Sequence, residues 1–183
     1  SKLSSAQAQL DLALRNGSED AMTIAFFYGE IGTLSGGLVS ADSMFTKAEA
    51  TASDDCKREI ARLRRNEWAP LVNGAINQLT ASNQDSAVAL LRRSTIIFRD
   101  SPVAYLRLAA FFAGRSQTDS AIAYFKLAGR SGDNPRELEF RMAGLVSAAR
   151  LQQGLQRWAD AEVTFRDFRR LAPRDLAGMA GLG

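Results

Sequence analysis

The sequence predicts an all-α fold built from stacked helical hairpins. An alanine recurs along the chain, with a large apolar residue four positions later and a usually small residue seven positions later. Residues at these spacings share one helical face, and the alanine lets a neighbouring helix approach closely. No run of β-branched residues alternates with polar residues as a strand would. The pattern occurs as Ala6/Leu10/Ala13, Ala41/Phe45/Ala48, Ala87/Leu91/Ser94, Ala121/Phe125/Ala128 and Ala161/Phe165/Phe168.

The distances between these alanines are close to regular. The alanines that begin successive copies of the pattern are 35, 46, 34 and 40 positions apart in the sequence. A period of about 34 residues is typical of helix–turn–helix arrays, in which each repeat buries its apolar face only against its neighbours. The sequence therefore predicts a scaffold that other molecules dock on.

Turn and cap signals divide the chain into helices. Proline follows a capping residue at Ser101-Pro102 and at Asn134-Pro135, where it suits the first helical position. Glu137 stands where a capping box has its glutamate. Polar turns over 82–85 and 116–119 and a cap at 53–55 mark further boundaries. We expect helices over 3–15, 19–34, 38–51, 54–80, 85–99, 102–114, 119–131, 135–154 and 157–171.

The segment from Ser101 to Pro135 carries the fullest repeat unit. Its first helix follows the spacing W-x2-L-G-x2-Y with conservative replacements, at Tyr105, Leu108, Ala109 and Phe112. Its second helix carries Ala121, Phe125 and Ala128. This unit resembles the tetratricopeptide (TPR) repeat. Other units match in part, through Tyr28-Gly29, through Leu71, Gly74 and Ala75, and through Leu145, Ala148, Ala149 and Pro173.

The resemblance implies an α-solenoid of about four TPR-like hairpins plus an N-terminal helix. We expect a single superhelical domain over 1–183. A non-repetitive helical bundle with coincidental alanines is the alternative. The expected units are 1–18 (partial), 19–53, 54–101, 102–134 and 135–173.

Two steps between alanines exceed the period. The step of 46 positions after Ala41 exceeds 34 by 12, and the surplus falls in Cys56–Ala69, before Pro70. Because proline removes a helical hydrogen bond, this stretch is either one kinked helix or two helices. The step of 40 positions after Ala121 exceeds 34 by 6, and we assign that surplus to the region around Gln152–Gln156. Both stretches are expected to project beyond the stack.

The composition argues against an enzyme. The chain has no histidine, which excludes Ser-His-Asp and Cys-His arrangements and most zinc-hydrolase sites within it. Cys56 is the only cysteine, so no internal disulfide is possible, and we interpret it as incidental. A helix start explains Asp54, Asp55 and Glu59 as well as a cation site would. We predict a non-enzymatic protein without cofactor or metal.

The glycine-rich stretch 29–37 invites two further hypotheses. Gly29, Gly32, Gly36 and Gly37 lack the G-K-[ST] ending of a P-loop and follow no strand. The run Ala21–Ala41 has the length of a membrane span, but Glu30, its glycines and its hydroxyl residues make it a poor one. We predict a buried helix pair there and no membrane span.

Charge is unevenly distributed along the chain. The net charge is −5 over 1–55, +6 over 56–115 and +2 over 116–183. The densest cluster lies on one expected helix and contains Arg64 together with a candidate basic patch. A solvated helix face explains the patch, and an acidic protein partner is the next alternative. Nucleic acid is disfavoured, because no aromatic residue interleaves the cluster. The patch consists of Lys57, Arg58, Arg62 and Arg65.

The resemblance also implies a function, because TPR proteins commonly hold a peptide or partner helix in a concave groove. The first helix of each hairpin would line that groove. The mixture of apolar residues with two arginines suits an amphipathic or acidic peptide, and it lacks the Lys/Asn pattern that clamps a C-terminal carboxylate. The repeat register places Phe26, Glu30, Val72, Asn73, Ile76, Leu106, Arg107, Ala110, Val146, Ser147 and Arg150 in the groove.

Two other roles remain open, and the location is unknown. The chain could self-associate through the helix over 56–70, or it could be a sensor or helper domain of a larger protein. Of the 23 basic residues, 19 are arginine, which suggests a GC-rich bacterial genome. The composition is compatible with bacterial cytoplasm or periplasm. The chain starts without Met and shows no signal peptide, as a mature or trimmed fragment would.

Overall fold

The computed structural model describes residues 4–5, 8–9, 12, 15 and 37–173, and these ranges contain helices and no strand. The all-α prediction is confirmed. The predicted helix over 19–34, most of the helix over 3–15, and Phe26 and Glu30 lie outside the described residues. The elements are α3 (Leu38–Thr51), α4 (Asp54–Thr80), α5 (Gln84–Ile97), α6 (Pro102–Gly114), α7 (Thr118–Arg130), the 3-10 turn η1 (Pro135–Glu137), α8 (Leu138–Gly154) and α9 (Trp158–Leu171).

The chain divides into two compact units. Unit 1 comprises residues up to 77 together with 93–98, and unit 2 comprises 78–92 together with the chain from 99 onward. Helices α4 and α5 therefore each contribute residues to both units. The expected single superhelix over 1–183 stays a prediction.

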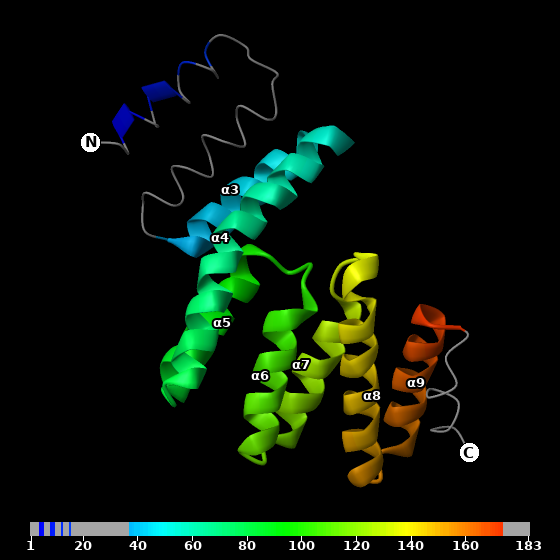
Figure 1. Cartoon of the computed structure of the whole chain (residues 1–183). Helices are drawn as coiled ribbons and strands as arrows, with labels where there is room; N and C mark the ends of the chain where they lie inside the picture. Colours follow the sequence, from blue (N-terminus) through cyan, green and yellow to red (C-terminus); the bar gives the residue numbers. More distant parts are fainter. Residues whose placement is uncertain (1–3, 6–7, 10–11, 13–14, 16–36, 174–183) are drawn as a thin grey trace. The chain divides into compact units, whose positions relative to one another are not determined.

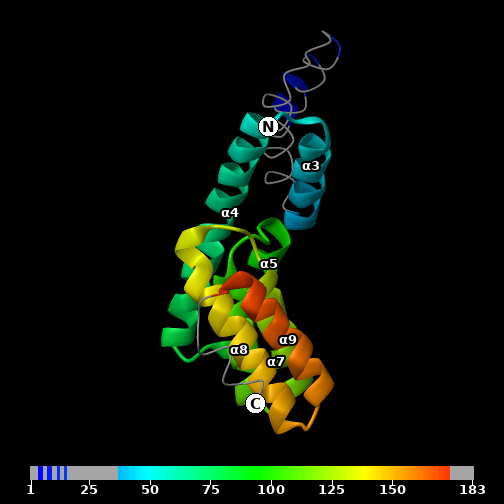
Figure 2. The same cartoon turned by 90° about the vertical axis from the view of Figure 1, so that its right-hand side faces the viewer.

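In unit 1, α3 and the first part of α4 lie side by side (Figures 1 and 2). Their core contains the alanine pattern of α3, with Ala41, Phe45 and Ala48 at most 3% exposed. Ile60 of α4 is buried against it, and Cys56, Leu63, Trp68 and Leu71 pack around this core. The expectation that 56–69 projects from the stack is therefore wrong. Residues 56, 60 and 63 share one helical face, and that face is apolar enough to be buried against α3.

Helix α4 is one continuous helix of 27 residues with Pro70 inside it. The choice between one helix and two is thereby decided in favour of one. Pro70 itself is solvent-exposed, so its ring does not displace core side chains.

In unit 2, α6 to α9 run side by side in alternating directions (Figure 1). Each helix packs against the next, and α6 also contacts α8. The alanine pattern again forms the contact surfaces, and only Phe125 of the patterned residues in α7 and α9 is not fully buried. The buried members are Ala121 and Ala128 at 0%, Ala161 at 2%, Phe165 at 3% and Phe168 at 1% exposure.

The turns within the hairpins have the same backbone geometry. Ser82, Ser116 and Gln156 have positive φ angles of 61°, 57° and 60°. In each turn, the amide of this residue bonds to the carbonyl three residues earlier, and the following amide bonds to the carbonyl five residues earlier. This pair of hydrogen bonds is the Schellman motif, which ends many helices. The motif occurs at Ser82, at Ser116 and at Gln156, so the repeat is visible in the backbone itself.

The extra residues in the step of 40 positions from Ala121 to Ala161 lie at a different place from the one predicted. Ser116 and Gln156 are 40 positions apart, but Pro102 and Pro135, which open the two hairpins, are only 33 apart. The extra residues therefore lie at the start of the α8 hairpin, in η1 and the first turn of α8. The assignment to Gln152–Gln156 is wrong: Gln152 is 1% exposed, and its Oε1 accepts a hydrogen bond of 2.8 Å from Thr164.

The caps are partly as expected. Asn134 Oδ1 accepts the amide of Arg136 at 3.1 Å, and Ser53 Oγ accepts the amide of Cys56 at 3.4 Å. Ser101 occupies the N-cap of α6 without capping it. Instead its hydroxyl donates to Glu137 Oε1 at 2.8 Å. The capping box predicted for Glu137 is wrong, because its carboxylate accepts the hydroxyl of Ser101, in the loop before α6.

Candidate functional site

The predicted groove residues of unit 2 lie on accessible faces of α6 and α8. Ala110 and Arg150 are exposed, and the other four are partly buried. The opposite faces of the same helices form the core, where Leu108, Ala109, Ala148 and Ala149 are 0% exposed. We call the accessible surface the α6–α8 face. It consists of Leu106, Arg107, Ala110, Val146, Ser147 and Arg150.

Arg107 has an unsatisfied donor on this face. Its Nε is buried and has no hydrogen-bond partner among the residues that the structure describes. Leaving a buried donor unpaired costs about 1–3 kcal/mol, and more when the group is charged. The fold therefore leaves one donor of Arg107 unpaired.

The predicted groove residues of α4 belong to unit 1, and one of them is misplaced. Val72 is 3% exposed, so it is not available to a partner. The reason is its register: Val72 and Ala75 lie three positions apart on one helical face, and Ala75 is 0% exposed. Asn73 is exposed and Ile76 is partly buried.

Two of the four residues of the candidate basic patch pair with acids of their own helix. Arg58 forms an ion pair with Asp55. Arg62 Nε donates to both carboxylate oxygens of Glu59, at 2.9 and 2.8 Å. This hydrogen bond lowers the pKa of Glu59 and raises that of Arg62. Lys57 is exposed. The arrangement fits a solvated helix face better than a docking site for phosphates.

Two arginines of the same cluster have inward contacts. The guanidinium of Arg65 lies 4.9 Å from the ring centroid of Phe98, although the residue is exposed overall. Arg64 is only 6% exposed and bonds to Asp42 and Glu49 of α3. Arg64 is therefore part of the core of unit 1 and not of the surface cluster in which the sequence placed it.

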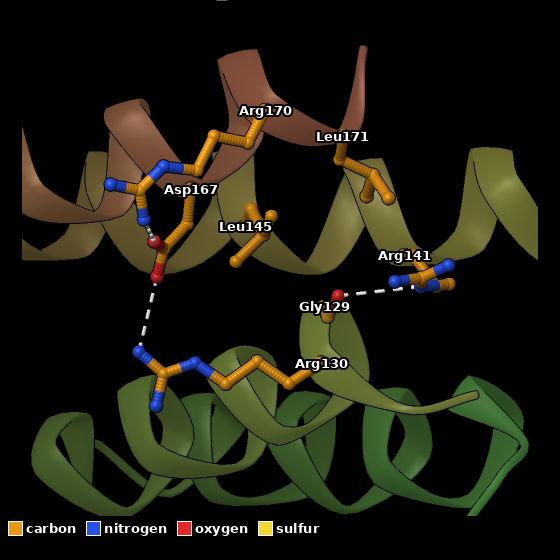
Figure 3. Close-up of a pocket in the computed structure, with 7 residues that line it drawn as sticks. All are labelled: Gly129, Arg130, Arg141, Leu145, Asp167, Arg170 and Leu171. Carbon is orange, nitrogen blue, oxygen red and sulfur yellow. Dashed lines mark hydrogen bonds and ion pairs between the residues drawn. The ribbon is translucent and has the colours of Figure 1, made fainter. Parts of the chain in front are cut away.

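Arginines also gather in a pocket of unit 2 that the sequence did not predict. The pocket has a volume of about 410 Å³ and lies between the ends of α7 and α9, over the start of α8 (Figure 3). We call it the arginine pocket. It is lined by Gly129, Arg130, Arg141, Leu145, Asp167, Arg170 and Leu171.

Asp167 organises one end of the arginine pocket. Its Oδ2 accepts from Arg130 Nη2 at 3.1 Å, and its Oδ1 accepts from Arg170 Nη1 at 3.4 Å. Arg141 lies on the other side of Leu145 (Figure 3), and its Nε donates to the carbonyl of Gly129 at 3.4 Å. The i,i+3 pair of Asp167 and Arg170 is visible in the sequence. The approach of Arg130 and Arg141 depends on how three helices pack.

The described part of the chain contains no group of three or more His, Cys, Asp or Glu side chains arranged to hold a metal ion. Within the same residues, no helix combines the length and the apolar character that crossing a membrane requires. Cys56 is a free cysteine, partly buried against the core of unit 1.

No protein-family model matches the sequence, and no curated protein matches it. Among solved structures, the chain is similar to the TPR2AB-domain:pHSP90 complex of yeast Sti1, with a TM-score of 0.41 and 17% identity. That alignment covers 98% of this chain and 75% of the other.

Proposed function

We propose that this chain is a protein-interaction scaffold whose α6–α8 face binds an acidic peptide or an acidic amphipathic helix. The observation that carries the proposal is the buried, unpartnered Nε of Arg107. Arg107 is partly exposed as a residue, so its side chain can turn outward, and a carboxylate from a partner would then accept the unpaired N–H through a charge-assisted hydrogen bond, which is stronger than a neutral one.

The neighbouring side chains suit the same partner. Leu106 and Val146 offer apolar area that is only partly buried, and Arg150 on α8 places a second guanidinium on the exposed surface. A helix with acidic residues beside a leucine stripe would match both features. The Ala110 position leaves room for close approach, because its side chain is small.

A pair of designed peptides tests this proposal. Both form amphipathic helices with the same leucine stripe, and their polar positions carry glutamate in one peptide and lysine in the other. Fluorescence anisotropy with labelled peptides would measure their affinities for the full chain. We expect the glutamate peptide to bind and the lysine peptide not to bind.

The double variant Arg107→Ala/Arg150→Ala assigns the contact. It should weaken the glutamate peptide by about 2 kcal/mol, or roughly 30-fold, because a charged pair loses one partner. Its melting temperature should not fall, since Nε of Arg107 has no partner to lose. Arg136→Ala is the matched control, because Arg136 is an exposed arginine of unit 2 outside this face. Equal binding of both peptides, or equal effects of variant and control, would contradict the proposal.

A further inference from the structure

We propose that the arginine pocket is a second binding site, for a ligand that carries an oxyanion group (phosphate or carboxylate) on a small apolar body. The pocket is lined by residues of α7, of α9 and of the first part of α8, and none of these residues belongs to the α6–α8 face. The two proposals are therefore independent, and either can fail alone.

The charge of the pocket favours an anion. Arg130, Arg141 and Arg170 line it with one carboxylate, that of Asp167, which leaves two positive charges without a counter-charge in the pocket. Each guanidinium has five N–H groups in a planar fork. The contacts within the pocket use only one nitrogen of each: Nη2 of Arg130, Nη1 of Arg170 and Nε of Arg141.

The C-terminal ends of α7 and α9 favour cations in this pocket, and Arg141 also donates to a carbonyl at the end of α7. Arg130 and Arg170 lie in the last turns of α7 and α9, where the negative end of the dipole stabilises a cation. Arg141 is the fourth residue of α8, whose own dipole disfavours a cation there, but its bond to the Gly129 carbonyl places it at the end of α7.

Arg141 is present because of the extra residues at the start of α8. Ser116 and Gln156 hold equivalent places in the α6–α7 and α8–α9 turns. These two residues are 40 positions apart, and the residue 40 positions before Arg141 is Ser101, which precedes α6. The preceding hairpin therefore has no helical residue at this place. The pocket is a feature of the last hairpin and not of the repeat in general.

The apolar part of the pocket defines the rest of the ligand. Leu145 lies between Arg141 and the group around Asp167 (Figure 3) but is only 1% exposed, so the partly exposed Leu171, on the Arg141 side, supplies the apolar surface. Leu145 packs closely on Gly129, where an added Cβ would lie 2.4 Å from its side chain. The volume of about 410 Å³ exceeds what a single phosphate or carboxylate group fills, so a small apolar body fits beside the anionic group.

Isothermal titration calorimetry of the full chain with phenyl phosphate and with phenylacetate, at physiological salt, tests the proposal. We expect saturable binding at one site for at least one of them, and the stronger probe identifies the anionic group. Inorganic phosphate should bind more weakly than phenyl phosphate, because it lacks the apolar body. Arg141→Gln should weaken the preferred probe about tenfold or more, as expected for one charge-assisted hydrogen bond.

Arg166→Gln is the matched control. Arg166 is an exposed arginine of α9 outside the pocket, paired with Glu162, and its loss should leave the affinity unchanged. Arg170→Gln provides a second pocket variant if Arg141→Gln proves unstable, because the Arg170 side chain is 80% exposed. The proposal is overturned if neither probe gives saturable binding. It is also overturned if the control weakens binding as much as the pocket variants, because the attraction would then be unspecific.

Discussion

The guanidinium of Arg64 on α4 lies 2.6 Å from the carboxylate of Asp42 on α3, measured between Nη1 and Oδ1, inside unit 1. The same nitrogen donates to the carbonyl of Ile97 at 2.9 Å, and Nε donates to Glu49 at 2.7 Å. The guanidinium also lies 5.1 Å from the ring centroid of Phe45. One side chain therefore joins α3, α4 and the end of α5.

We expect Arg64→Ala to lower the free energy of unfolding by about 3 kcal/mol, because it removes the guanidinium that pairs with Asp42 and Glu49 in a partly buried network. Arg64→Lys should restore only part of this loss, since an ammonium cannot reproduce the planar fork. Urea denaturation followed by circular dichroism would measure both. Arg62→Ala, on the exposed face of the same helix, is the control and should unfold like the parent. An Arg64→Ala protein as stable as this control would show that the network contributes no net stability.

Close packing of α7 on α8 depends on Gly144. A Cβ at this position would lie 2.7 Å from the backbone carbonyl oxygen of Phe125 and 3.0 Å from the Cβ of Ala128. Because backbone atoms cannot move aside cheaply, Gly144→Ala should destabilise the protein by about 1–2 kcal/mol, despite its better helix propensity. Gly154→Ala on the same helix is the control, because nothing lies within 4 Å of the added atom. Thermal unfolding of the two variants should shift in opposite directions, and a common direction would contradict this account.

The stability of unit 2 should fall at alkaline pH because of Tyr105. Burial is the main cause that raises the pKa of this phenol, and Asp100 adds to it while Arg99 opposes it. Above pH of about 10, the unfolded chain releases the phenolic proton while the folded chain retains it. The contribution of Tyr105 is therefore fully present below that pH and is lost as pH rises through the folded pKa, at up to about 1.4 kcal/mol per pH unit. Urea denaturation between pH 7 and 11 should show a shallower decline for Tyr105→Phe, and parallel declines would assign the effect to other groups.

The helices could be predicted from the sequence because their signals are local. The described helices begin and end within three residues of the expected positions, and the largest difference is at the start of α8, because 135–137 form a 3-10 turn. The alanine pattern identified buried faces, since its members four and seven positions apart must share a helical face. The polar turns at Ser82 and Ser116 were likewise readable from neighbouring residues.

The contacts that tertiary packing decided join residues distant in the sequence. Arg64 looked like one of five neighbouring basic residues until packing against α3 buried it. Ser101 and Glu137 each matched a local cap pattern, but the meeting of two loops joined them to one another. The arginine pocket arises only where α7, α8 and α9 meet. Sequence by itself therefore determined which segments are helices and which faces are apolar, because both follow from residues within one or two turns. Only the tertiary structure decided which charges are buried, paired or left open to a ligand, because that depends on which helices become neighbours.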